Sequence, residues 1–129
     1  MKVLTFGTFS KFHKGHEYHL NEASKYGDLY VVLARDKTVK EVKGKPPEEN
    51  ELIRLKKVNN LKFVKKALLG SKGDKYEVLT DTKPDIICLG YDQTHFTEKL
   101  EEELKKRNIK SEIIRIKAYK PEKYKTSLL

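Results

Sequence analysis

The sequence has little cysteine and no long apolar run, and both facts exclude classes of protein. Among its 129 residues only Cys88 is a cysteine, which excludes an internal disulfide framework and fits a cytoplasmic protein. No apolar run approaches the ~20 residues that cross a membrane. We see no signal-peptide pattern, internal repeat, linker or low-complexity segment, so we expect one domain over residues 1–129.

The charge is strongly basic, with a formal net charge of +9 and 36% charged residues. A basic balance suits polyanionic ligands, either nucleotides or nucleic acid. The lysines are spread along the chain and interleaved with acidic residues, whereas a nucleic-acid groove concentrates them with stacking aromatic side chains. We therefore expect no nucleic-acid partner and keep a non-catalytic nucleic-acid-binding domain only as a remote alternative.

Apolar runs alternate with amphipathic segments, and this alternation predicts an α/β fold. Continuous apolar runs are typical of strands that are buried on both faces. We expect strands at Val3–Phe6, Leu29–Ala34, Phe63–Leu69, 85–90 and Ser111–Ile116, and helices at His16–Tyr26, Glu48–Leu61, Lys75–Thr82 and Thr97–Arg107. In the second helix, Leu52, Leu55 and Val58 form the stripe expected to face inward. The pattern predicts three layers: a doubly wound five-stranded parallel sheet with helices on both faces.

His13-Lys14-Gly15-His16 is the most informative motif, because it follows the first strand and a Gly7-Thr8-Phe9 turn. Backbone N–H groups at a helix start attract anions, and a glycine allows a ligand to approach the backbone. Histidines at i and i+3 share one helical face, so both reach the same phosphate. A metal pair and ordinary surface histidines are the alternatives, but no third ligand of matching type lies nearby, since His19 falls outside the motif.

In this context the motif resembles the signature of the nucleotidyltransferases, which implies nucleotidyl transfer with His13 and His16 as the catalytic pair. The reaction needs donors that stabilise charge as the α-phosphorus becomes five-coordinate. It needs no protein nucleophile if the acceptor is an ionised phosphate. We predict that Gly7, Thr8 and Phe9 join the two histidines in binding the nucleotide.

A second group of candidates follows the second strand and would bind the acceptor or its phosphate. Lys43 and Lys45 flank a glycine in what reads as a loop, and a solvated loop is the alternative. Asp36 has the right position to hold magnesium or an acceptor hydroxyl, or else to cap the next helix. Arg54 is a candidate for the acceptor phosphate, or a surface partner of a neighbouring side chain.

A third group lies near the fourth strand and at the end of the chain. Gly90 permits close approach of a ligand, and Asp92 is placed to accept from ribose hydroxyls, as acidic residues at strand ends do in nucleotide folds. A simple turn is the alternative there. Thr126 and Ser127 add two hydroxyls to the nucleotide-binding candidates, against the alternative of a frayed terminus.

Together these segments resemble the cytidylyltransferase-like branch of the nucleotidyltransferases, which has a Rossmann-like fold. Its first motif matches the Gly7–Phe9 turn and the His13–His16 segment, whereas its C-terminal motif is reduced to Lys125-Thr126-Ser127. Within the branch the chain is similar to archaeal FAD synthases in the segments Ala34–Val39, Lys43–Pro46, Leu69–Ser71 and Lys83–Gln93.

This resemblance implies a reaction and several roles. AMP would pass from ATP to FMN, giving FAD and pyrophosphate, with Mg²⁺ or another divalent cation on the triphosphate and a homodimer as the assembly. His13 and His16 would stabilise the transition state, and Asp36, Lys43, Asp92 and Thr126 would fall in the nucleotide or acceptor site. The alternative within the branch is transfer from CTP to glycerol 3-phosphate or another phosphate acceptor.

Overall fold

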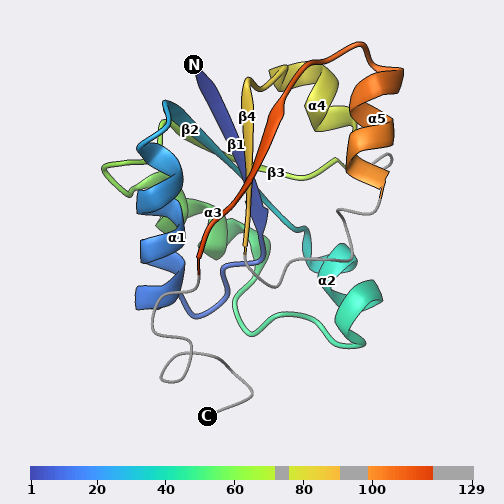
Figure 1. Ribbon diagram of the computed structural model, residues 1–129. Coiled ribbons are helices and arrows are strands. Elements are labelled where there is room, and N and C mark those ends of the chain that lie inside the picture. Colours follow the sequence, from blue (N-terminus) through green and yellow to red (C-terminus); the bar gives the residue numbers. More distant parts are fainter. Residues whose placement is uncertain (72–75, 91–98, 118–129) are drawn as a thin grey trace.

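The computed structural model describes residues 1–71, 76–90 and 99–117, which form an α/β domain (Figure 1). The strands are β1 (Lys2–Gly7), β2 (Asp28–Leu33), β3 (Lys66–Leu69), β4 (Ile86–Leu89) and β5 (Glu112–Arg115). The helices are α1 (Lys14–Ser24), α2 (Asp36–Lys43), α3 (Glu51–Asn59), α4 (Glu77–Thr82) and α5 (Leu100–Lys106).

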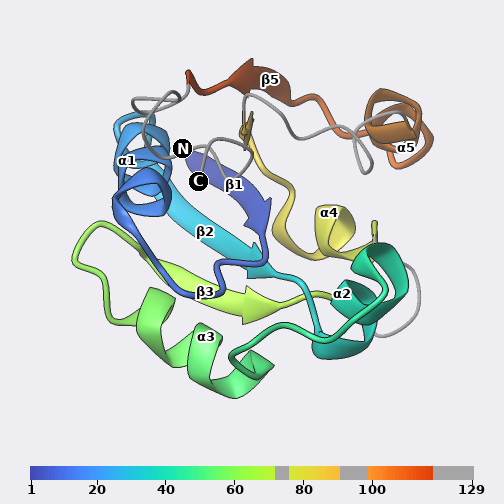
Figure 2. The ribbon, with the colours of Figure 1, turned by 90° about the horizontal axis from the view of Figure 1, so that it is seen from below.

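The described strands form one sheet of five in the order β3-β2-β1-β4-β5, and every neighbouring pair is parallel. Helices α1 and α3 cover one face and α4 and α5 the other (Figure 2). This confirms the three-layer, doubly wound, Rossmann-like sheet expected from the sequence. The strand order changes direction between β1 and β4, and ligands of such sheets bind at that point, beyond the carboxyl ends of the strands.

Alternation along the strands explains why the sheet is buried on both faces. In β1, Val3 packs in the layer beneath α1 and α3, whereas Leu4 packs in the layer beneath α4 and α5. In β4 the same alternation places Cys88 in the first layer and Ile87 in the second. Because side chains of a strand alternate between its faces, an unbroken apolar run supplies two cores at once.

The prediction of a loop after the second strand is only partly right, because Asp36–Lys43 forms α2 and the loop begins at Gly44. The helix is short and buries only Val39, so it lacks the repeated apolar stripe by which longer helices are found. It ends at Gly44, whose φ of 82° is the left-handed conformation that glycine adopts most easily. Lys43 is therefore the last helical residue rather than a loop residue.

The inward stripe predicted for the next helix is also partly wrong. Val58 is buried and Leu55 packs against the core, but Leu52 is 67% exposed. Arg54 takes the inner position instead, with no exposed surface. A charged side chain can replace an apolar one there only because the surrounding backbone satisfies its donors, as described below.

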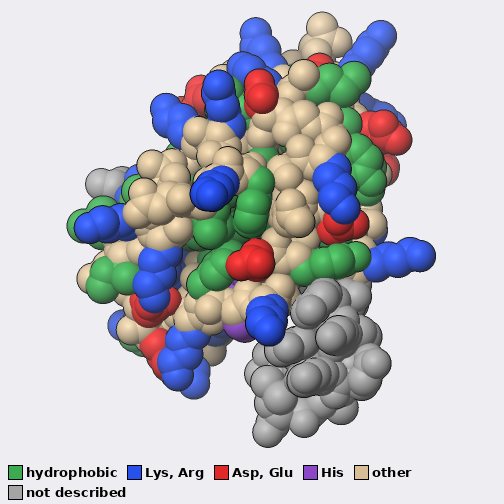
Figure 3. Space-filling view, turned by 90° about the vertical axis from the view of Figure 1, so that its left-hand side faces the viewer, with side chains coloured by type: hydrophobic (Ala, Val, Ile, Leu, Met, Phe, Trp, Pro, Cys, Tyr) green, Lys and Arg blue, Asp and Glu red, His purple; other side chains and the backbone are tan. Residues whose placement is uncertain are grey.

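Basic side chains are dispersed over the surface. Figure 3 shows one side of the molecule, on which Lys and Arg side chains are spread with acidic ones between them rather than gathered in one groove. Within the described segments, no helix is both long and apolar enough to span a membrane.

Candidate active site at the carboxyl ends of the strands

The two motif histidines form the cap of α1. His13 is the N-cap residue, with extended φ and ψ of −135° and 178°, and its Nδ1 accepts the Gly15 amide at 3.0 Å. In return, Nδ1 of His16 accepts the His13 amide at 3.3 Å, which completes a capping box. The two rings stack with centroids 3.8 Å apart and planes inclined by 22°. The spacing of three residues therefore builds both the helix start and the histidine pair.

The cap also fixes where each neutral ring carries its proton. A neutral imidazole has one donor and one acceptor nitrogen. Because Nδ1 of both His13 and His16 accepts a backbone amide, the proton of each neutral ring must lie on Nε2. Both Nε2–H groups are then donors that the cap itself does not use.

Electrostatics keep His16 neutral near pH 7. Burial and, to a smaller extent, electrostatic repulsion from His13, His19 and Lys43 together lower the pKa of His16 to about 4. A neutral donor keeps its hydrogen-bonding capacity without the cost of burying a charge. Figure 1 shows α2, which ends at Lys43, and the start of α1 at the same end of the strands.

The turn between β1 and α1 is tightly built. Phe9 is buried and its ring covers Gly7, so that a Cβ on Gly7 would lie 2.5 Å from Cε2 of Phe9. The Phe9 ring also meets the His16 ring edge-on, at 5.3 Å between centroids. Phe9 and Lys11 have φ values of 54° and 51°, in the left-handed region. Such non-glycine residues cost about 1–3 kcal/mol each and persist only where surrounding structure holds them.

Arg54 is placed differently from its predicted position at the acceptor phosphate. Its side chain is completely buried and its donors are used within the protein. Nη1 donates to the carbonyls of Thr8 at 2.9 Å and Ala34 at 2.8 Å, and Nε donates to that of Glu49 at 2.9 Å. Nη2 pairs with Oδ1 of Asp36 at 2.8 Å. Four of the five N–H groups of a guanidinium are thereby satisfied, so Arg54 organises the ends of β1 and β2.

The remaining acceptor candidates lie along α2 and beyond it. Asp36 is the first residue of α2, not its cap, and its amide donates to Oε1 of Glu51 at 2.8 Å. Lys43 and Lys45 are exposed on either side of Gly44. All three follow the carboxyl end of β2, and their roles toward the acceptor stay predictions.

Other nucleotide-binding candidates are placed only in part. Gly90 follows β4, and its carbonyl accepts Nη1 of Arg115 at 2.8 Å. Asp92, Thr126 and Ser127 lie outside the described residues. Their assignment to the nucleotide therefore stays a prediction.

Sequence reasoning missed a polar chain beneath the motif. The buried Thr5 hydroxyl donates to the Cys88 carbonyl at 2.7 Å and also lies 2.7 Å from Nε2 of His19. A hydroxyl has one proton, so Nε2 of His19 must be the donor to Thr5. The signals available were a threonine within an apolar strand and a third histidine three residues after His16.

Cys88 itself is inert in this arrangement. Burial raises the pKa of its thiol to about 11, so the thiolate needed for nucleophilic chemistry is not formed near neutral pH. Cys88 is therefore a buried structural thiol.

The described residues contain no group of three or more His, Cys, Asp or Glu side chains placed to hold a metal ion. Enzymes of nucleotides usually bind Mg²⁺ through one or two carboxylates together with the substrate phosphates, so a preformed cage is not required. Asp36 is the one carboxylate among the predicted acceptor residues, and its Oδ1 is engaged by Arg54. The donor set fits a cation that arrives on the triphosphate.

The fold and this edge of the sheet define the class of protein. A parallel doubly wound sheet, with a strand, a glycine turn and a capped helix start at the switch in strand order, is a nucleotide-binding arrangement. Residues 4–129 match the family model described as cytidylyltransferase-like. The chain belongs to the cytidylyltransferase-like family, and its resemblance to this family is confirmed.

Within this family, the chain is similar to several archaeal proteins that are named FAD synthase. The FAD synthase of Aciduliprofundum boonei is 48% identical over 120 residues, covering 92% of this chain and 80% of the relative. The FAD synthase of Methanosarcina mazei is 50% identical over 118 residues, covering 89% and 76%. That of Methanobrevibacter ruminantium is 43% identical over 125 residues, covering 93% and 82%.

Solved structures agree on the fold. The lipopolysaccharide core biosynthesis protein of Thermoplasma volcanium is 40% identical, with a TM-score of 0.86 over 92% of this chain and 98% of that one. A pantoate-beta-alanine ligase from Francisella tularensis is 15% identical, with a TM-score of 0.63 over 92% of this chain and 60% of that one. The second likeness concerns the fold alone.

Proposed function

We propose that this protein is an FMN adenylyltransferase, which makes FAD and pyrophosphate from FMN and ATP. An oxygen of the FMN phosphate attacks the α-phosphorus of ATP in line with the bond to the bridging oxygen. The new P–O bond forms as the bond to that oxygen breaks, and pyrophosphate leaves with the electron pair. The several FAD synthases at 43–50% identity support the choice of substrates.

The observation that carries the chemistry is the histidine cap of α1. Two backbone-fixed imidazoles present their Nε2–H groups at a helix start, where the helix dipole also favours negative charge. Charge grows on the α-phosphate oxygens in the transition state, and donors oriented in advance stabilise it without reorganising. His13 and His16 are thus the proposed catalytic residues.

Other residues take proposed supporting roles. Gly7, Thr8, Phe9 and Gly90 line the nucleotide side, together with the predicted Asp92, Thr126 and Ser127. Lys43, Lys45 and Asp36 serve the acceptor side and its phosphates. Mg²⁺ or another divalent cation, bound with the triphosphate, neutralises phosphate charge. Arg54 is reassigned from phosphate binding to positioning.

The setting of the enzyme completes the proposal. We place it in the cytoplasm, in agreement with the low cysteine content. We propose a homodimer as the assembly, which sedimentation at micromolar concentration would test.

The test is product analysis by chromatography with Mg²⁺ and two substrate pairs, FMN with ATP and glycerol 3-phosphate with CTP. FAD in the first reaction, and its much slower formation when His16→Ala replaces the wild type, would support the proposal. CDP-glycerol in the second reaction without FAD in the first would keep the histidine mechanism and overturn the choice of substrates. No product in either would overturn the proposed function.

A further inference from the structure

The turn of residues 8–11 is held from outside by the beginning of α3. It contains Phe9 and Lys11, whose φ values of 54° and 51° lie in the left-handed region. Glu49, two residues before α3, accepts the Lys11 amide through Oε1 at 2.7 Å. The Glu49 amide in turn donates to Oγ of Ser10 at 3.4 Å. Partners nearly forty positions apart in the sequence thus fix this turn.

Arg54 extends this contact to the second strand. One nitrogen of its guanidinium, Nη1, donates both to the Thr8 carbonyl in the turn and to the Ala34 carbonyl at the end of β2. Its Nε donates to the Glu49 carbonyl, so the two residues are also tied to each other. A single buried side chain therefore sets the distance between the histidine side of the site and the α2 side.

We infer that Glu49 and Arg54, here called the clamp, are positioning residues that preset the turn 8–11 and align it with the end of β2. For catalysis this inference rests on the proposed function, because β1 carries the nucleotide side and β2 the acceptor side. Neither clamp residue touches substrate in this assignment. An in-line displacement is sensitive to such alignment, since small displacements of the reacting groups cost large factors in rate.

The clamp has a matched pair of surface variants. Glu49 also forms an ion pair with Lys57, and this pair together with the Lys11 amide holds the pKa of Glu49 below its ordinary value. Glu49→Ala removes both the ion pair and the acceptor of the Lys11 amide. Lys57→Ala removes the same ion pair and leaves that acceptor in place, so the difference between the two variants isolates the contact with the turn.

The first measurement is amide hydrogen exchange at single residues by NMR. We expect the Lys11 amide to exchange at least about tenfold faster in Glu49→Ala than in Lys57→Ala, with unchanged exchange in β1 and β2. The second is steady-state kinetics, in which Glu49→Ala should lower kcat by about tenfold and change the KM for ATP by less than about threefold.

Arg54→Lys tests the buried half of the clamp, with Arg107→Lys at the C-cap of α5 as its control. Lysine keeps the charge but not the fork of donors, so we expect a larger fall in kcat than for Glu49→Ala in the protein that remains folded. If Arg54→Lys does not fold, the comparison of Glu49→Ala with Lys57→Ala tests the clamp by itself.

The outcomes separate the two proposals. Equal exchange at Lys11 in Glu49→Ala and Lys57→Ala, or equal kcat in both, would overturn the clamp even if the wild type makes FAD. If the wild type makes no product from either substrate pair, the proposed function fails, and exchange at Lys11 then supports or overturns the clamp by itself.

Discussion

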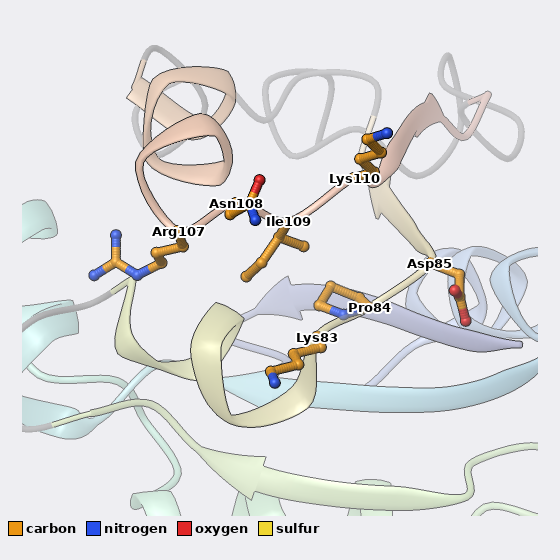
Figure 4. Close-up of a pocket in the computed structure, with 7 residues that line it drawn as sticks. All are labelled: Lys83, Pro84, Asp85, Arg107, Asn108, Ile109 and Lys110. Atoms are coloured by element: carbon orange, nitrogen blue, oxygen red, sulfur yellow. The ribbon is translucent and has the colours of Figure 1, made fainter.

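The two ends of the sheet differ in how they use polar side chains. At the carboxyl end, Arg54 is fully buried and bound by backbone carbonyls from three separate segments. At the amino end lies a hollow of about 360 Å³ between the starts of β4 and β5, with Lys83, Arg107 and Lys110 among its lining residues (Figure 4). None of these three side chains is buried. The polar groups that line this hollow are thus more exposed to solvent than Arg54 is.

Backbone conformation sharpens this contrast. Lys83, at the amino end, has a positive φ of 46° as the C-cap of α4, where a left-handed residue is an ordinary way to end a helix. Phe9 and Lys11, at the carboxyl end, have positive φ in a turn that ends no helix. Backbone strain of this kind indicates a functional site better than an open volume does, because a fold keeps a strained backbone only at a cost in stability.

Among substitutions that test the difference between the two ends, we expect the largest effect at the carboxyl end, on catalysis. His16→Ala removes one preoriented donor and should lower kcat by about 10²–10³-fold with the fold intact. Glu22→Ala, which breaks an ion pair with Lys25 in the last turn of the same helix, is the control and should leave the rate unchanged. A rate near that of the wild type in His16→Ala would remove the histidine from the mechanism.

The next largest effect is expected on stability, from a substitution that crowds the end of β1. Gly7→Ala would bring a Cβ to 2.5 Å from the ring of the buried Phe9, whereas Gly70→Ala meets nothing closer than 3.6 Å. We expect Gly7→Ala to lower the free energy of unfolding by about 1–3 kcal/mol, as overpacking does. Urea unfolding measures it, and similar values for both variants would show that the turn after β1 is not tightly packed.

The lowered pKa of His16 predicts a pH dependence of stability. Its pKa of about 4 in the folded protein lies below the ordinary 6.5, so the unfolded chain takes up the proton first as the pH falls. The contribution of His16 to stability is therefore fully present above about pH 6.5 and is lost as the pH falls from there to about 4. At pH 5 the free energy of unfolding has fallen by about 2 kcal/mol on this account. Urea unfolding at pH 7 and pH 5 measures this fall in the free energy of unfolding. We expect the fall to be smaller in His16→Asn than in the wild type by about 2 kcal/mol, and an equal fall in both proteins would contradict the assignment.

The smallest effect is expected at the amino end. Lys110→Ala lies in the hollow of Figure 4, at the opposite end of the strands from the histidines. We expect kcat and KM to stay at wild-type values and the unfolding free energy to change by less than about 0.5 kcal/mol. A clear loss of activity in this variant would show that the hollow takes part in function.

Much of the fold could be predicted because it depends on local patterns. The apolar runs at Val3–Phe6 and Leu29–Ala34 lie within one residue of β1 and β2 at each end. Helix α2 escaped prediction because eight residues with one buried side chain give too little periodicity. In α3 the apolar stripe indicated Leu52, but the structure turned Arg54 inward, since carbonyls of other segments were there to receive it.

The sequence by itself determined the class of the protein and the histidine pair, because strand, glycine turn, cap and helix start all lie within the first sixteen residues. The tertiary structure alone decided what holds that site in place. Arg54 meets Thr8 across 46 positions, and Thr5 meets the Cys88 carbonyl across 83. Such contacts have no local signature, because a buried donor is satisfied by whichever carbonyl the fold brings to it.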